Sequence, residues 1–310
     1  MYYKIQYNRP KISIIRHGVS RGPTDRLARA HSLARARVRR SVGRRPSMRR
    51  RSTRRGRGSD AGVVDHDAVS VSVSIIVPTY EERVNIGTLY ELIRESERAF
   101  NDERGRWEII VVDDNSPDGT ADVVREIQRA YDDGDGLVLM ERPGKLGLGS
   151  AYVHGLTRAR GAEVVIMDAD LSHHPKYIGD FLRMRRANDL DVVSGTRYAK
   201  GGGVAGWDFR RKLTSRAANY IAKVALAPGA SDLTGSFRLY KRDVLKALVS
   251  AVQSKGYVFQ MEIIVRAKKA GYTVGEVPIT FVDRLYGESK LGASEIVGYL
   301  RGLIKLFFTL

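Results

Sequence analysis

Two aspartates, Asp168 and Asp170, come directly after an apolar run at residues 164–167. In an extended chain, residues two apart point to the same side, so the two carboxylates can offer oxygens to one hard cation. An isolated Asp-x-Asp is more often a surface turn, but a wholly apolar run before it is typical of a buried parallel strand. Ligands of α/β proteins bind at the carboxyl ends of such strands. We therefore expect the pair to hold Mg²⁺ or Mn²⁺, with the other coordination positions left to diphosphate oxygens and water.

Two further carboxylates, Glu82 and Asp114, also follow predicted strands. The carboxyl ends of parallel strands share one edge of a sheet, so these side chains can converge with the aspartate pair. Asp114 can accept hydrogen bonds from the edge of a base or a ribose, and the alternative is a role in forming its turn. His173 and His174 are adjacent, and adjacent residues rarely chelate one ion. For the histidines we expect a structural role or a substrate contact.

Several basic residues lie at the predicted boundaries of elements rather than along one helix face: Arg197, Arg211, Arg284 and Lys290. Loop positions flanked by glycine favour contacts with anions, and a solvated surface is the alternative. Arg211 and its two basic neighbours stand near the start of a predicted helix, where cations oppose the helix dipole unless an anion is bound. Phosphate binding and plain solvation both remain open from these residues alone.

Strands and helices are expected to alternate along the chain from residue 71. The expected strands are 71–77, 107–112, 137–140, 164–167 and 277–282, and the expected helices include 80–100, 147–159, 209–226, 258–270 and 294–310. This alternation predicts a three-layer α/β domain with a mostly parallel central sheet. No Gly-x-Gly-x-x-Gly sequence follows the first strand, which argues against a dehydrogenase-type Rossmann domain.

The positive charge of the chain is confined to its first residues. Residues 1–59 hold 17 arginines and two lysines against Asp25 alone, which accounts for the whole net charge of +18. Few apolar residues and strong self-repulsion predict a disordered, Arg-rich extension at 1–70, followed by one folded domain at 71–310. The extension is interpreted as a solvated tail, as a segment attracted to anionic lipid or RNA, or as an organellar presequence. It carries no motif for a specific nucleic acid.

The sequence has no cysteine, which excludes disulfides and thiolate metal sites. No apolar run approaches the length of about 18 residues that crosses a bilayer. The longest candidate, residues 296–310, is interrupted by Arg301 and Lys305. We expect a non-spanning chain whose helices at 209–226 and 294–310 are candidates for contact with the membrane surface or a partner.

Seven motifs occur in order within the folded part of the chain. They are 78–82 (Pro-Thr-Tyr-Glu-Glu), 113–114 (Asp-Asp), 145–149 (Lys-Leu-Gly-Leu-Gly), 168–174 (Asp-Ala-Asp-Leu-Ser-His-His), 194–198 (Ser-Gly-Thr-Arg-Tyr), 232–238 (Asp-Leu-Thr-Gly-Ser-Phe-Arg) and 284–290 (Arg-Leu-Tyr-Gly-Glu-Ser-Lys). Together they resemble the catalytic subunits of the dolichol-phosphate mannosyltransferases, which are inverting family 2 glycosyltransferases with the GT-A fold. The resemblance covers about residues 71–310. Asp-x-Asp alone is not specific, whereas the ordered set is.

The resemblance implies a role for individual residues. The guanosine part of GDP-mannose would be held by Pro78, Tyr80, Glu82, Val112 and Asp114. The diphosphate would be held, through Mg²⁺ or Mn²⁺, by Asp168, Ala169 and Asp170. The donor phosphates or the reacting centre would be contacted by Arg197, Arg284 and Lys290, and the lipid phosphate by Arg211 and Ser215. Two positions depart from the family pattern: Glu81 stands where Asn is common, and Ser172 where some members have a metal-binding Gln.

The resemblance also implies a reaction and a setting. Mannose would pass from GDP-mannose to dolichyl phosphate by direct displacement, giving dolichyl β-D-mannosyl phosphate for protein glycosylation and GPI-anchor synthesis. Asp170, Arg197, Arg284 and Lys290 would carry the catalysis. The implied partners are small membrane subunits and the membrane surface, and the implied location is the cytoplasmic face of the endoplasmic reticulum membrane. The alternatives are a UDP-glucose-dependent dolichyl-phosphate glucosyltransferase, a polysaccharide synthase, a non-catalytic scaffold and an RNA-binding protein.

Overall fold

The computed structural model describes residues 70–131, 136–206, 219, 229–254, 258–283 and 304. All of them lie within one compact unit, Val64–Leu310. Of the extension expected at residues 1–70, only Ser70 is among them, so its disorder and the domain boundary stay predictions.

The strands are β1 (Val71–Thr79), β2 (Arg106–Asp113), β3 (Leu137–Glu141), β4 (Glu163–Ile166), β5 (Val192–Thr196), β6 (Gly203–Ala205), β7 (Arg238–Lys241), β8 (Val274–Pro278) and β9 (Thr280–Val282). The helices are α2 (Arg83–Phe100), α3 (Thr120–Tyr131), α4 (Leu148–Leu156), α5 (Tyr177–Asn188), α7 (Arg242–Ala251) and α8 (Val258–Lys269).

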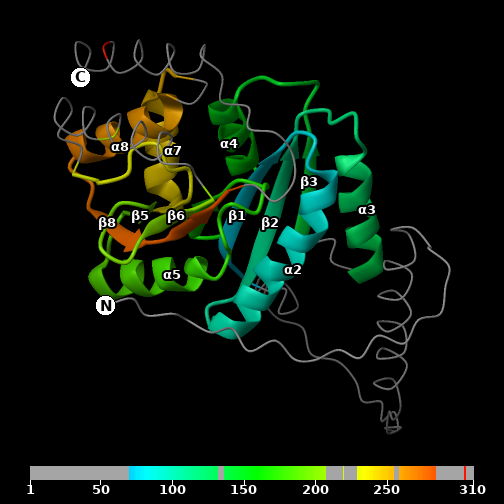
Figure 1. Cartoon of the computed structure of the whole chain (residues 1–310), viewed down its shortest axis with the longest axis horizontal. Helices are drawn as coiled ribbons and strands as arrows, with labels where there is room; N and C mark the ends of the chain where they lie inside the picture. Colours follow the sequence, from blue (N-terminus) through cyan, green and yellow to red (C-terminus); the bar gives the residue numbers. More distant parts are fainter. Residues whose placement is uncertain are drawn as a thin grey trace, which may run out of the picture. The chain divides into compact units, whose positions relative to one another are not determined.

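A seven-stranded sheet in the order β3-β2-β1-β4-β7-β5-β8 forms the centre of this unit (Figure 1). β1 to β4 pair in parallel, as do β5 and β8, which confirms the mostly parallel sheet predicted from the sequence. β7 runs antiparallel between β4 and β5, and its Arg238 pairs with Ile166 on one side and Ser194 on the other. The amino end of β7 therefore lies at the same sheet edge as the carboxyl ends of its neighbours.

Side chains of the central strands alternate between two apolar cores. In β1, Ile76 packs with α4, α7 and α8, whereas Ile75 and Val77 pack with α2, α3 and α5. Figure 1 shows these helices on opposite sides of the sheet. The three β1 side chains are fully buried, and burying each contributes about 1.5–3 kcal/mol. Two covered faces explain why the strands read as continuous apolar runs, and the predicted three-layer arrangement is confirmed.

Helix α4 approaches the sheet closely at Gly155. A Cβ added there would lie 2.7 Å from Cγ2 of Ile76 and 3.1 Å from Cγ2 of Val112. The helix begins after Gly147, whose φ of 95° lies in the left-handed region that favours glycine. The glycines of this stretch therefore let α4 and the turn before it lie close to the ends of β1 and β2.

Most predicted strand bounds differ from the observed ones by one or two residues, and two of the differences have a structural reason. The first strand does not stop at Pro78 but continues to Thr79. β4 pairs with β1 only as far as Ile76, so the missing N–H of Pro78 faces no strand on that side. Residues 277–282 form two strands instead of one, because β8 ends at Pro278 and β9 pairs with β6 in a separate sheet.

Among the described residues, no helix combines the length and the apolar character that crossing a bilayer requires.

Candidate functional site

The loops that follow β1, β2 and β4 leave the sheet at one edge. Thr79 pairs with Asp113 at the ends of β1 and β2, and β4 ends opposite Ile76 of β1. Pro78 and Val112, two of the residues expected to bind a nucleoside, are paired in register. The sheet therefore brings the motifs at 78–82, 113–114 and 168–174 to the same edge, as expected from the sequence.

The loops after β1 and β2 are fastened together by two aspartates. Asp113 accepts hydrogen bonds from Oγ1 of Thr79 at 2.8 Å and from Oγ of Ser116 at 2.6 Å. Asp118 accepts from the backbone N–H of Arg83 at 3.0 Å, where helix α2 begins. Asp113 is thus engaged inside the protein, whereas its neighbour Asp114 is partly exposed.

Asp114 forms a two-pronged ion pair with Arg142, a residue just beyond β3. Nε of Arg142 donates to Oδ1 at 2.6 Å, and Nη2 donates to Oδ2 at 2.7 Å. Burial raises the pKa of Asp114, although the Arg142 guanidinium acts to lower it. Arg142 also donates to Oγ of Ser150 in α4 at 2.7 Å. Asp114 is therefore held in one orientation, with its charge balanced by an arginine that sequence reasoning missed.

Tyr80 and Glu82 lie in the loop between β1 and α2. Nζ of Lys145, from the Gly-rich turn, lies 3.4 Å from the centroid of the Tyr80 ring. A cation over an aromatic face is favourable, and it brings a positive charge to the edge at which an anionic nucleotide is expected. Oε2 of Glu82 accepts a hydrogen bond of 2.7 Å from Nδ2 of Asn85, which fixes this carboxylate at the start of α2.

Asp168 and Asp170 lie in the loop after β4 and not in the strand, since β4 ends at Ile166. Alternation along an extended strand therefore does not govern the directions of their side chains. Leu171 has a φ of 62°, a left-handed conformation that turns the loop back on itself. The Asp170 side chain is buried, whereas that of Asp168 is 33% exposed. The two carboxylates of this turn therefore differ in their exposure to solvent.

Each carboxylate is oriented by a serine. Oδ1 of Asp170 accepts hydrogen bonds from the N–H and the Oγ of Ser172, at 3.1 and 2.5 Å. Oδ2 of Asp168 accepts from Oγ of Ser236 at 2.7 Å. The hydroxyl of Ser172 thus donates a hydrogen bond to Asp170. The Ser236 contact joins the β4 loop to the segment that enters β7.

The two neighbouring histidines lie in opposite environments. His173 is buried between Phe237 and Phe281, with ring centroids 5.2 and 5.3 Å away. Burial lowers the pKa of His173, against the raising effect of Asp168 and Asp170. His174 is exposed, and its Nδ1 accepts a hydrogen bond from the backbone of Lys176 at 3.1 Å. The aromatic packing gives His173 the surroundings of a core residue, and the expected structural role or substrate contact stays a prediction.

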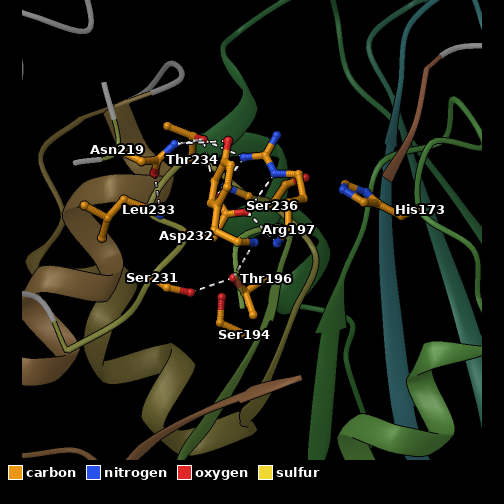
Figure 2. A network of polar contacts seen from close by, with 12 residues as sticks. His173, Ser194, Thr196, Arg197, Asn219, Ser231, Asp232, Leu233, Thr234 and Ser236 are labelled. Carbon is orange, nitrogen blue, oxygen red and sulfur yellow. Dashed lines mark hydrogen bonds and ion pairs between the residues drawn. The ribbon is translucent and has the colours of Figure 1, made fainter. Parts of the chain in front are cut away.

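Arg197 follows β5 and is held by Asp232 in a buried ion pair (Figure 2). Nε and Nη2 of Arg197 donate to the two carboxylate oxygens, each at 2.7 Å, and Nη2 also donates to Oγ1 of Thr234 at 2.6 Å. Burial acts to raise the pKa of Asp232, but the Arg197 guanidinium lowers it below its ordinary value. Oδ1 of Asn219 accepts from the backbone of Leu233 at 3.0 Å and supports the same segment. Arg197 was expected to meet donor phosphates, and its charge is already balanced by Asp232.

Four of the expected site residues lie outside the described part of the chain: Arg211, Ser215, Arg284 and Lys290. The same holds for most of the two helices expected at 209–226 and 294–310, of which only Asn219 and Ile304 are described. The roles given to these residues stay predictions.

The donor set near Asp168 and Asp170 fits a hard divalent cation, because carboxylate oxygens are its preferred protein ligands. Within the described residues, no group of three or more His, Cys, Asp or Glu side chains could hold a metal ion. A cation bound here would therefore take several of its ligands from substrate and water, which is the usual arrangement for Mg²⁺.

Comparison with known proteins gives one family and close relatives. Residues 74–249 match the family described as Glycosyl transferase family 2. The chain is 39% identical over 226 residues to the polyprenol monophosphomannose synthase of Mycolicibacterium smegmatis, covering 72% of this chain and 82% of that protein. It is 37% identical over 240 residues to the dolichol-phosphate mannosyltransferase of Pyrococcus furiosus, covering 76% of this chain. It spans 64% of the Pyrococcus protein, slightly under two thirds of its length.

A solved structure has a similar fold. It is a mannosyltransferase from Pyrobaculum calidifontis in complex with GDP-Man and Mn²⁺, with a TM-score of 0.50 and 21% identity. The match covers 91% of this chain and 74% of that chain. At this level of identity the likeness concerns the fold, and it agrees with the GT-A-like arrangement of sheet and helices.

Proposed function

The chain belongs to glycosyl transferase family 2, and we therefore propose that it is a polyprenol-phosphate mannose synthase. The observation that carries the proposal is the identity of 39% to the mycobacterial synthase across 82% of that protein. In its finer form, the proposal is transfer of mannose from GDP-mannose to dolichyl phosphate, yielding dolichyl β-D-mannosyl phosphate. The site geometry supports this reading, since carboxylates, an aromatic ring and basic side chains meet at one sheet edge.

The proposed donor site begins with the loops after β1 and β2. Asp114 would accept hydrogen bonds from the guanosine, and its orientation by Arg142 would fix where those bonds form. Pro78 and Val112 lie side by side in the sheet and would border the nucleoside together with Tyr80. Glu82 would add a second carboxylate, held in place by its contact with Asn85.

Asp168 and Asp170 would hold a divalent cation, Mg²⁺ or Mn²⁺, against the donor diphosphate. When bound, such a cation neutralises charge that develops on the leaving diphosphate. The chain's own contribution is orientation: Ser172 holds Asp170, and Ser236 holds Asp168. Arg197, whose charge is balanced by Asp232, would contact the donor phosphates or the reacting centre, as would Arg284 and Lys290.

The proposed acceptor is a phosphate monoester, whose second pKa is about 6, so it is mostly a dianion at neutral pH. Its oxygen would attack the anomeric carbon of mannose while the bond from that carbon to the GDP oxygen breaks, and GDP leaves with the electron pair. One displacement inverts the α-linked donor to a β-linked product. No proton has to be removed from the acceptor. Arg211 and Ser215 would hold the lipid phosphate during this step.

The setting proposed for the enzyme is the cytoplasmic face of the endoplasmic reticulum membrane, with small membrane subunits as partners and the product used in protein glycosylation and GPI-anchor synthesis. These proposals rest on the family resemblance of the sequence. The surfaces expected to make the contacts, at residues 209–226 and 294–310, fall mostly outside the described residues.

The test is a transfer assay with radiolabelled GDP-mannose or UDP-glucose, dolichyl phosphate, and either Mg²⁺ or Mn²⁺. We expect labelled mannosyl lipid from GDP-mannose, lost when the cation is chelated. Asp170→Ala should lower kcat by about 10²–10³-fold, the usual effect of removing one group that stabilises a leaving anion. Asp180→Ala, a change at a half-exposed aspartate in α5, is the matched control and should keep full activity. Transfer from UDP-glucose alone, or undiminished turnover in Asp170→Ala, would overturn the proposal.

A further inference from the structure

His173 is fixed in place by aromatic packing on both sides. Its ring lies against Phe237 at an interplanar angle of 30° and meets the edge of Phe281 at 75°. The residue is only 3% exposed. In Figure 2 it lies apart from the hydrogen-bonded group around Arg197. A ring held in this way has little freedom to turn, so the direction of its nitrogens is set by the core.

One of these nitrogens is buried without a partner. Among the described residues, no atom forms a hydrogen bond with Nδ1 of His173. A buried polar atom left unsatisfied costs about 1–3 kcal/mol, so such atoms call for an explanation. The ion-pair partner nearest to Nδ1 is Oδ2 of Asp168, at 3.7 Å. That distance exceeds a hydrogen bond of about 2.9 Å by about 0.8 Å.

Asp168 is the partner that can move. Its side chain is 33% exposed, whereas that of His173 is 3% exposed. The loop that carries Asp168 leaves β4 two residues earlier, and its Oδ2 is already drawn toward the β7 segment by Ser236 at 2.7 Å. A small rotation of the carboxylate would bring Oδ2 to Nδ1 while the Ser236 contact is kept, because one carboxylate oxygen accepts two hydrogen bonds.

We propose that His173 is a positioning residue for the cation site: its Nδ1–H donates to Oδ2 of Asp168 when a divalent cation is bound, and fixes the carboxylate in its ligating orientation. The inference rests on the proposed function, because it takes Asp168 as a cation ligand. Groups behind the ligands commonly orient them, and losing one costs about 10–100-fold in metal affinity. A neutral imidazole carries one proton, and the facing carboxylate selects Nδ1 as its site.

Three variants separate hydrogen bonding from packing. His173→Asn keeps a donor close to the position of Nδ1, His173→Gln moves the amide toward the position of Nε2, and His173→Phe keeps an aromatic ring without a donor. Mn²⁺ affinity is measured by calorimetry on the full chain with GDP present. We expect His173→Phe and His173→Gln to weaken Mn²⁺ binding about 10–100-fold and His173→Asn to bind as the wild type does. Equal Mn²⁺ affinity in all four proteins, or equal loss in His173→Asn and His173→Phe variants that melt as the wild type does, would overturn the proposal.

A second measurement is made on the protein that retains His173. Protein with ¹⁵N-labelled histidine is followed by long-range ¹H–¹⁵N NMR, and the His173 signal is assigned by its absence from His173→Asn. With Mg²⁺ and GDP added, we expect Nδ1 of His173 to carry the proton. A proton on Nε2 under these conditions would contradict the inference even if His173→Phe failed to fold.

Asp168→Asn distinguishes this inference from the proposed function on which it rests. If Asp168→Asn weakens Mn²⁺ binding and His173→Phe does not, the cation site stands and the role of His173 is wrong. If Asp168→Asn binds Mn²⁺ as tightly as the wild type, the cation site itself is misplaced, and the role of His173 falls with it.

Discussion

Arg142 offers the sharpest test of how the nucleoside side of the site is built. Its side chain is 4% exposed and that of its partner Asp114 is 12% exposed. Arg142→Met removes the guanidinium but keeps a long, flexible side chain in the same space. The carboxylate of Asp114 is then left largely buried without its counterion and without two hydrogen bonds of 2.6 and 2.7 Å.

The expected cost follows from the burial of the pair. Removing one member of a buried ion pair costs about 3–5 kcal/mol, because the other charge stays buried and uncompensated. Asp114 keeps some contact with water, so we expect the lower end, about 3 kcal/mol of unfolding free energy. The double variant Arg142→Met with Asp114→Asn removes both charges, and it should recover most of this loss.

The unfolding free energy lost in Arg142→Met should depend on pH in a defined direction. Burial already raises the pKa of Asp114 in the folded protein, and without Arg142 the pKa rises further. In Arg142→Met, the folded state therefore binds a proton at Asp114 more tightly than the unfolded chain does. The destabilisation is greatest at neutral pH, and it shrinks as the pH falls through the pKa that Asp114 has in the folded variant. Relative to the wild type, Arg142→Met should therefore regain stability as the pH falls from neutral toward the ordinary pKa range of an aspartate.

Urea unfolding of the wild type, the single variant and the double variant across this pH range checks the prediction. The double variant should show no pH-dependent gain, because the amide introduced by Asp114→Asn does not titrate. A loss below about 1 kcal/mol in Arg142→Met, the size of an exposed pair, would show that Arg142 is not needed to balance Asp114. An equal loss in single and double variants would show that packing, rather than charge, explains it.

Two further predictions concern stability. Asp232→Asn removes the carboxylate that pairs with the buried Arg197 guanidinium and should cost about 3–5 kcal/mol, seen as a lower Tm; an unchanged Tm would contradict the buried ion pair. Gly155→Ala should destabilise by about 1–3 kcal/mol, because its Cβ would lie 2.7 Å from Cγ2 of Ile76. The matched control is Gly87→Ala in α2, where a Cβ meets nothing within 4 Å; it should stabilise by about 0.5–1 kcal/mol. Equal effects in the two glycine variants would refute the close approach of α4.

Many of the residues at the sheet edge that carries the candidate site could be predicted from the sequence, because their positions depend on where the strands end. Pro78 and Val112 lie side by side, and the loops with Asp114 and Asp168 leave the same edge. Arg142 also lies at this edge, directly after β3. It was missed because a lone arginine after a short strand has no local pattern that separates it from a solvated one.

Partners far apart in sequence could not be predicted. Arg197 was read as an anion-binding cation, yet its carboxylate partner lies 35 residues later in the chain. Ser236 reaches Asp168 across 68 residues. Both contacts depend on the antiparallel insertion of β7, and strand direction is decided by which neighbours a strand pairs with, not by its own residues. The division of 277–282 into two strands has the same origin, because β9 pairs outside the main sheet.

The antiparallel direction of β7 has one more consequence. The chain enters β7 through residues 232–237, and this single segment supplies the carboxylate that holds Arg197 and the hydroxyl that holds Asp168. The two contacts are therefore connected through one short segment of the chain. A ligand that displaces Asp168 would therefore alter the surroundings of Arg197, on the far side of β7, without any domain movement.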